Sequence, residues 1–101
     1  MINDTDSPIL LCCLLWAHPG QEVGLTEYES RVLSLVAEHG GAVLQRVISD
    51  GVGGRPNEVQ IYRWDNQAAL DAYVNDPRRQ ALSDERDRVI ARTELFPVEL
   101  A

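Results

Sequence analysis

The sequence predicts an α+β domain, in which a four-stranded antiparallel sheet carries helices on one of its faces. Apolar stretches of strand length alternate with stretches of helical period in the order β-α-β-β-α-β. A length of 101 residues suits a single domain. The composition, 45% hydrophobic and 25% charged, is that of an ordinary globular protein and excludes a disordered chain.

The N-terminal part predicts an arm, a strand and a helix. Residues 1–8 are polar and end in Pro8, so we expect a flexible arm before a domain over residues 9–101. Ile9 to His18 is apolar at both alternating positions, as in a strand that is covered on both faces. A helix follows and stops at Gly40-Gly41. Its helically spaced inward residues are Leu25, Tyr28, Val32, Leu35, Val36 and His39.

Two further strands form a predicted hairpin. Residues 42–49 and 58–64 are of strand length and rich in β-branched residues. The glycine-rich segment 50–57 connects them. It contains no lysine and joins two strands, so we interpret it as a turn and not as a phosphate-binding loop.

The C-terminal part predicts a broken helix and a last strand. Asp65 or Asn66 is expected to cap the first helical piece, and Asp76-Pro77 interrupts it because proline suits a first helical position. The helix restarts at Arg78 and runs to about Ala91. Thr93 to Leu100 then closes the sheet, with Pro97 suiting an edge strand. A mixed charged face is interpreted as solvated or interface-lining and comprises Arg78, Arg79, Asp84, Glu85, Arg86, Asp87 and Arg88.

This element order is that of the ferredoxin-like fold. Its helices cover only one face of the sheet, yet the stretch Ile9–His18 is apolar on both faces. A second copy of the chain is the simplest cover for the other face. We therefore expect a homodimer in which two sheets face each other.

Charge and cysteine usage exclude several classes of function. The net charge is -7, and all nine basic residues are arginine. A nucleic-acid or membrane partner is therefore not expected, and lysine-based catalysis is excluded. The apolar run from residue 9 to 17 is too short to span a membrane. Cys12 and Cys13 are interpreted as buried hydrophobes in a reducing cytoplasm.

The segment Asn57–Val89 resembles the second half of the dimeric α/β-barrel superfamily. Shared features are the strand aromatics Tyr62 and Trp64, Tyr73 before the Asp76-Pro77 break, and the Arg78-Arg79 pair. The resemblance is closest to a bacterial branch of unknown function related to antibiotic-biosynthesis monooxygenases. It extends over nearly the whole chain, from residue 9 to 100.

The resemblance implies a homodimer with a small-molecule cleft in each subunit, between sheet and helices or inside the barrel. Relatives include cofactor-free monooxygenases and muconolactone isomerases, as well as accessory proteins. No cofactor is expected. The function predicted from the resemblance is therefore small-molecule binding, with oxygenation, isomerisation or cyclisation of an aromatic or polyketide-like metabolite in secondary metabolism. A non-catalytic accessory or metabolite-binding dimer is the alternative, and the sequence leaves open whether the protein is an enzyme.

Three residues are candidates for catalysis. His18 ends the first strand, and the predicted topology places Arg55 and Arg92 at the same end of the sheet. An imidazole beside a guanidinium suits proton transfer and the holding of an anion. His18 is therefore the candidate acid or base, and Arg55 or Arg92 the candidate anion holder. In the alternative interpretation, His18 starts the turn and bonds a backbone carbonyl.

Five residues are candidates for substrate binding. Trp16, Tyr62 and Trp64 would form walls, with Tyr62 and Trp64 facing the barrel interior or the partner and Val59 and Ile61 facing the helices. Arg46 and Arg63 would either pair with an acid such as Glu58 or Glu94, or hold an anionic ligand.

No metal site is expected. The two histidines are predicted at opposite ends of the domain, and the two cysteines point to opposite faces of one strand.

Overall fold

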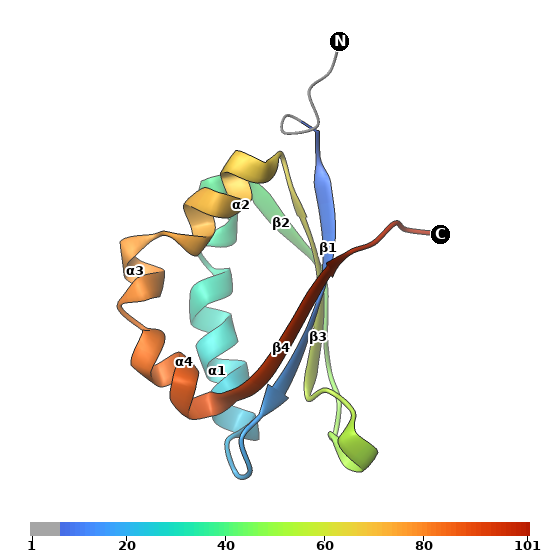
Figure 1. The fold of residues 1–101 in the computed structure, drawn as a ribbon, viewed down its shortest axis with the longest axis vertical. Helices are drawn as coiled ribbons and strands as arrows, with labels where there is room; N and C mark the ends of the chain where they lie inside the picture. The colour runs from blue at the N-terminus through green and yellow to red at the C-terminus, as the bar shows by residue number, and fades with distance from the viewer. Residues whose placement is uncertain (1–6) are drawn as a thin grey trace.

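The computed structural model describes residues 7–101, so the predicted arm lies largely outside the described residues. Four strands form one antiparallel sheet in the order β2-β3-β1-β4, and the helices lie on one of its faces (Figure 1). The ferredoxin-like β-α-β-β-α-β order is confirmed. The strands are β1 (Ile9–Ala17), β2 (Gly41–Ile48), β3 (Glu58–Trp64) and β4 (Ile90–Pro97). The α-helices are α1 (Glu22–Leu33), α2 (Gln67–Val74), α3 (Pro77–Gln80) and α4 (Ser83–Val89), and the short 3₁₀ turns are η2 (Val36–His39) and η3 (Val52–Gly54).

The helix caps follow the local sequence signals. The Asn66 side chain accepts a hydrogen bond from the Ala69 N–H and caps α2. Asp76 caps α3, with Pro77 in the first helical turn. The predicted break at Asp76-Pro77 is confirmed.

Two predicted boundaries are wrong. The first helix ends at Leu33, and residues 36–39 form the separate turn η2, which Gly40 closes in the left-handed region at φ 75°. The last strand spans Ile90–Pro97 and not Thr93–Leu100. It begins early because Ile90 already pairs with Ala17 of β1, across a register shift between Trp16 and Ala17.

The hydrophobic core lies between the sheet and the helices, and it corrects the orientation predicted for β3. Trp64 is fully buried and Tyr62 nearly so, and both belong to the core cluster beneath the helices. Because side chains alternate along a strand, Val59 and Ile61 face the opposite side of the sheet. The remaining core residues are Leu11, Cys13, Leu15, Leu25, Tyr28, Val32, Val36, Tyr73, Val89 and Ile90.

Within residues 7–101, no helix covers the other face of the sheet, here called the open face (Figure 1). It carries Val47 of β2 and Phe96 of β4, whose exposed fractions are 53% and 40%. Val47 pairs with Val59, and Phe96 pairs with Cys12, so the apolar surface continues across the sheet. Exposed apolar surface of this kind marks an interaction surface.

Candidate functional site

A cavity of about 150 Å³ lies between the sheet and the helices. Strands β1, β3 and β4 supply its floor, and α1, α2, α3 and α4 supply residues on the helical side. Apolar residues such as Leu33, Leu70 and Leu95 line part of it. Its polar and titratable residues are Cys13, Glu29, Gln60, Tyr62, Tyr73, Arg79, Arg86 and Thr93. Apolar walls with a few convergent polar groups are typical of small-molecule sites.

Glu29 of α1 is the carboxyl group of this cavity. Its residue is 6% exposed, and its Oε1 accepts a 2.8 Å hydrogen bond from Nε2 of Gln60. Burial raises the pKa of Glu29 above its ordinary value, although the bond from Gln60 acts in the opposite direction. A buried carboxyl group with a raised pKa is a candidate proton donor or acceptor.

Glu58 and Arg46 form the ion pair that supports this carboxyl group. Nε2 of Gln60 also donates a 2.7 Å bond to Glu58, which is fully buried. Nε of Arg46 donates to the same Glu58 oxygen at 2.6 Å, and the Arg46 guanidinium further bonds Thr26 and Ser30. Arg46 therefore has an acidic partner, as one of its two predicted interpretations requires. Its N–H donors are directed toward Glu58 and α1, so few of them are free to bind a ligand.

Two tyrosines form the aromatic side of the cavity. Tyr73 of α2 packs on Trp64 with ring centroids 4.9 Å apart, and Tyr62 meets Trp64 edge-on at 5.5 Å. Burial raises the pKa of Tyr73 to about 12 and also raises that of Tyr62. Both phenols are therefore neutral hydrogen-bond donors at neutral pH. Trp64 contacts both tyrosine rings but does not itself line the cavity.

Arg79 and Arg86 are the cationic groups of the cavity, and both are half-buried. The Arg79 guanidinium lies over the Tyr73 ring, 5.0 Å from its centroid. The charged face predicted as solvated or interface-lining is thus divided: Arg79 and Arg86 turn toward the cavity. Arg78 and Arg88 are more than half exposed.

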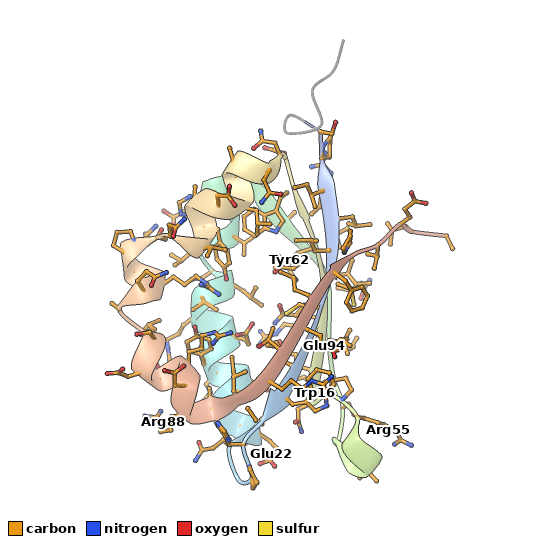
Figure 2. The ribbon with its side chains drawn as sticks, viewed as in Figure 1. Trp16, Glu22, Arg55, Tyr62, Arg88 and Glu94 are labelled. Atoms are coloured by element: carbon orange, nitrogen blue, oxygen red, sulfur yellow. The ribbon has the colours of Figure 1, made fainter. Side chains whose placement is uncertain are left out.

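The predicted catalytic residues lie elsewhere, at the end of the sheet where β1 stops. Trp16 bonds the Gly54 carbonyl at 2.9 Å, and Arg92 lies over the Trp16 ring at 4.4 Å while pairing with Glu94 (Figure 2). Trp16, Arg92 and Glu94 lie on the open face, because Trp16 pairs with Arg92 and Leu14 with Glu94. Arg55 is nearby in the 50–57 loop, 68% exposed and 3.9 Å from Asp50.

His18 begins the turn after β1, as one interpretation predicts. Its backbone N–H donates to the Val89 carbonyl, and its carbonyl accepts from Gln21. The structure places His18, Arg55 and Arg92 near the same end of the sheet, where β1 stops. Within residues 7–101, the His18 ring makes no hydrogen bond or ion pair that would join it to either arginine.

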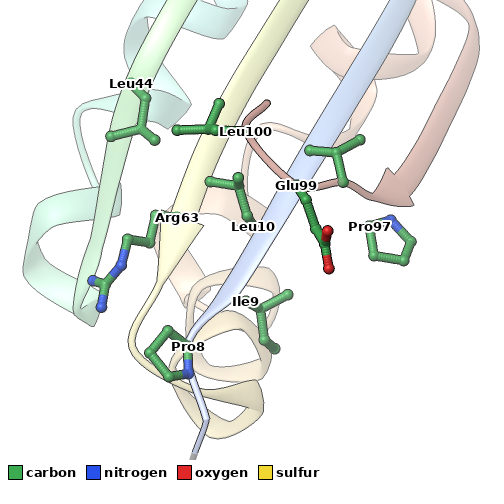
Figure 3. Close-up of a pocket in the computed structure, with 9 residues that line it drawn as sticks. Pro8, Ile9, Leu10, Leu44, Arg63, Pro97, Glu99 and Leu100 are labelled. Carbon is green, nitrogen blue, oxygen red and sulfur yellow. The ribbon is translucent and has the colours of Figure 1, made fainter.

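Arg63 borders a wider groove of about 580 Å³ at the opposite end of the open face. Its side chain is 46% exposed and bonds Asp65 at 3.3 Å, not Glu58 or Glu94. Leu10, Leu44 and Leu100 also line this groove (Figure 3). Its walls are mainly apolar, which suits cover by protein better than directed binding of a small molecule.

The described part of the chain contains no helix long and apolar enough to cross a membrane. Among residues 7–101, no three His, Cys, Asp or Glu side chains come together as a metal site. Cys12 and Cys13 are free thiols and both are buried, as predicted. Burial raises the pKa of Cys13 to about 12, so this cavity-lining thiol is not a nucleophile at neutral pH.

Sequence reasoning missed Glu29, Arg79 and Arg86. The signal for Glu29 was its spacing: it lies four residues after Leu25 and three before Val32, on the apolar face of α1. The sequence gives no comparable indication that Arg79 and Arg86 line the cavity, because the direction of their side chains depends on how α3 and α4 are oriented after Pro77.

Solved structures share this fold at low sequence identity. PA3566 of Pseudomonas aeruginosa is 19% identical with a TM-score of 0.72, over 98% of this chain and 100% of that one. A Bacteroides thetaiotaomicron protein described as a candidate antibiotic biosynthesis monooxygenase is 13% identical with a TM-score of 0.73, over 95% and 91%. A Bacteroides fragilis protein described as dimeric, of ferredoxin-like fold and unknown function, is 14% identical with a TM-score of 0.67, over 92% and 96%. No protein-family model and no curated protein matches the sequence.

Proposed function

We propose that this protein is a homodimer that binds a small cyclic metabolite in the cavity between its sheet and its helices. The observation that carries the proposal is the lining of that cavity: Glu29, Tyr62 and Tyr73 converge there with two arginines and an apolar wall. The open face supports the dimer, because Val47 and Phe96 are exposed apolar residues on an uncovered sheet. The dimeric Bacteroides fragilis protein with the same fold agrees with this assembly.

The volume of the cavity limits the ligand. About 150 Å³ is the size of a cavity that holds a benzene-sized molecule, whereas drug-sized ligands need roughly 300 Å³ or more. A single ring fits the cavity as it stands. A polycyclic polyketide would require the helices to move away from the sheet.

The chemistry that this lining supplies is proton transfer. Glu29 is the candidate acid or base, because it is the carboxyl group of the cavity lining and burial raises its pKa above the ordinary value. Tyr62 and Tyr73 are candidate donors to an oxygen that becomes negative. Isomerisation or cyclisation of an enolisable ring compound needs these groups and no resident cofactor. Oxygenation would require a substrate that itself reacts with O₂ once deprotonated.

A second candidate site is the Trp16 end of the open face, which a partner subunit would enclose. The Arg92 guanidinium over the Trp16 ring, with Arg55 nearby, is the observation that favours it. His18 would be its acid or base. Against it, Arg92 already has Glu94 as a partner.

One titration separates the two sites, because the chain has only two tryptophans. Trp64 contacts the cavity tyrosines, and Trp16 lies on the open face. Phenol added to ¹⁵N-labelled protein is expected to shift the Trp64 indole resonance and leave that of Trp16 in place. Trp16→Phe assigns the two signals. A shift of the Trp16 signal alone would move the site to the open face, and no shift of either would contradict the proposal.

A cavity-filling variant gives the matched control. Leu70→Trp places a larger side chain in the cavity and is expected to abolish the phenol-induced shift. Ala68→Trp adds the same side chain at an exposed position of α2 and should leave the shift unchanged. Equal responses of both variants would show that phenol binds elsewhere.

A further inference from the structure

The arginines of this protein differ in whether they have an acidic partner. Seven of the nine pair with a carboxylate within residues 7–101. The two that do not are Arg79 and Arg86, which are also the two that line the cavity. A guanidinium that is half removed from water is normally paired.

The hydrogen bonds of these two arginines leave donors unused. Apart from its contact with Tyr73, Arg79 makes one 3.4 Å contact to the Val74 carbonyl, and Arg86 makes one 3.4 Å contact to the Thr93 hydroxyl. Both distances exceed the ordinary range for an N–H···O bond. Nε of Arg79 is buried and has no hydrogen-bond partner among the described residues. A buried donor without an acceptor is unusual in a native protein.

Tyr28 adds a third unused donor at the same place. Its residue is 1% exposed, and its hydroxyl has no hydrogen-bond partner within the described chain. Tyr28 lines an outer depression of about 370 Å³, together with Arg79 and Arg86. Since these two arginines line both the depression and the inner cavity, they stand where the two meet. Asp87 is the one acid in the lining of the depression, and it is exposed.

We propose that the ligand of this cavity is a small cyclic carboxylic acid, held through its carboxylate by Arg79 and Arg86 with the Tyr28 hydroxyl as a further donor. This inference rests on the proposed function and specifies its ligand class. Guanidinium groups bind carboxylates in a bidentate manner, and the ring would lie inward against Tyr62 and Tyr73. Glu29 is hydrogen-bonded to Gln60 on the sheet side. Burial raises the pKa of Glu29, which favours its neutral form beside a second carboxylate.

The test compares benzoate with benzamide, which have similar shape and differ in charge. The dissociation constant of each is measured by NMR titration of the Trp64 indole signal. Benzoate is expected to bind at least tenfold more tightly, although the protein carries a net charge of -7. Arg79→Gln and Arg86→Gln should each weaken benzoate roughly tenfold, as for loss of a charge-assisted hydrogen bond. Tyr28→Phe should weaken it about two- to tenfold without disturbing the fold.

The control is Arg88→Gln, which removes an exposed arginine from the outer side of α4 (Figure 2). It should leave benzoate binding within about twofold of wild type. Equal affinities for benzoate and benzamide would overturn the carboxylate inference and leave the cavity as a ligand site. So would equal losses in Arg79→Gln and Arg88→Gln. Failure of both probes to bind would contradict the proposed function itself.

Discussion

The Nε2 atom of Gln60 donates a 2.8 Å hydrogen bond to Oε1 of Glu29. This bond connects the cavity to an ion pair between β2 and β3, because the same nitrogen also bonds Glu58, which pairs with Arg46. Two carboxyl groups thus share one amide donor, and only Glu58 has an arginine. Burial raises the pKa of Glu29, although the bond from Gln60 acts in the opposite direction.

Glu29→Gln is expected to stabilise the folded protein at neutral pH. Gln at this position can still accept the bond from Gln60 and carries no charge to bury. Since the pKa of Glu29 is raised in the folded state, ionisation above its ordinary value of 4.5 opposes folding. Wild type should therefore lose stability relative to Glu29→Gln as pH rises above 4.5, by about 1.4 kcal/mol for each unit of pKa shift. Urea denaturation at fixed protein concentration, in a pH series, measures this difference.

Glu27→Gln is the control for this prediction, because Glu27 is exposed on the same helix. Its effect on the free energy of unfolding should stay small at every pH. Identical pH profiles for the two variants would mean that Glu29 is not specifically destabilised by burial.

Arg46→Ala is expected to be strongly destabilising. It leaves Glu58, which is fully buried, without its cationic partner, and loss of one member of a buried pair costs about 3–5 kcal/mol. Arg63→Ala should cost less than about 1 kcal/mol, since the Arg63–Asp65 pair is about half exposed. Chemical denaturation of both variants measures the contrast. Similar costs would refute the structural role assigned to Arg46.

Phe96→Glu is expected to dissociate the dimer. It places a charge on the apolar open face, where Phe96 of β4 pairs with Cys12 of β1. Val23→Glu is the matched change on α1, at a residue 71% exposed and away from the open face, and should leave the assembly intact. Sedimentation velocity gives the oligomeric state of each. Dissociation by Val23→Glu but not Phe96→Glu would place the interface on the helices.

Asp76→Asn is expected to lower Tm at neutral pH. Asp76 accepts hydrogen bonds from Arg78 and a 2.7 Å bond with the His39 ring, and these hold its pKa well below the ordinary value of 3.8. A lowered pKa stabilises the fold above that value, and the effect is lost as pH falls toward the pKa of the folded state. The Tm difference should therefore shrink below about pH 4. Asp71→Asn, at an exposed position of α2, should show no such trend.

The order of the strands and helices, and the residues at which helices break or end, could be predicted from the sequence because both depend on local chemistry. Pro77 after Asp76 breaks the second helical region wherever the chain folds, and Gly40 supplies a left-handed cap. The apolar character of Ile9–Ala17 on both faces also predicted apolar side chains on the face of the sheet that the helices do not cover. These signals need no knowledge of distant contacts.

The orientation of β3 was not readable, because its two faces are similar in hydrophobicity. Val59 and Ile61 suggested a core face, but the larger rings of Tyr62 and Trp64 fill the space beneath the helices. Gln60 and Glu58 face inward with them because side chains alternate along a strand, and Glu29 and Arg46 supply their polar partners. Those partners come from other elements, so the sequence of β3 alone does not indicate them. The cavity was missed for the same reason.

Native mass spectrometry of the protein with added benzoate tests the central claim most directly, since one spectrum reports both assembly and ligand occupancy. The account predicts a species at twice the chain mass that gains up to two benzoate molecules, and a matched spectrum with Leu70→Trp in which the dimer stays empty. A monomer that gains no benzoate would contradict both the covered open face and the cavity site.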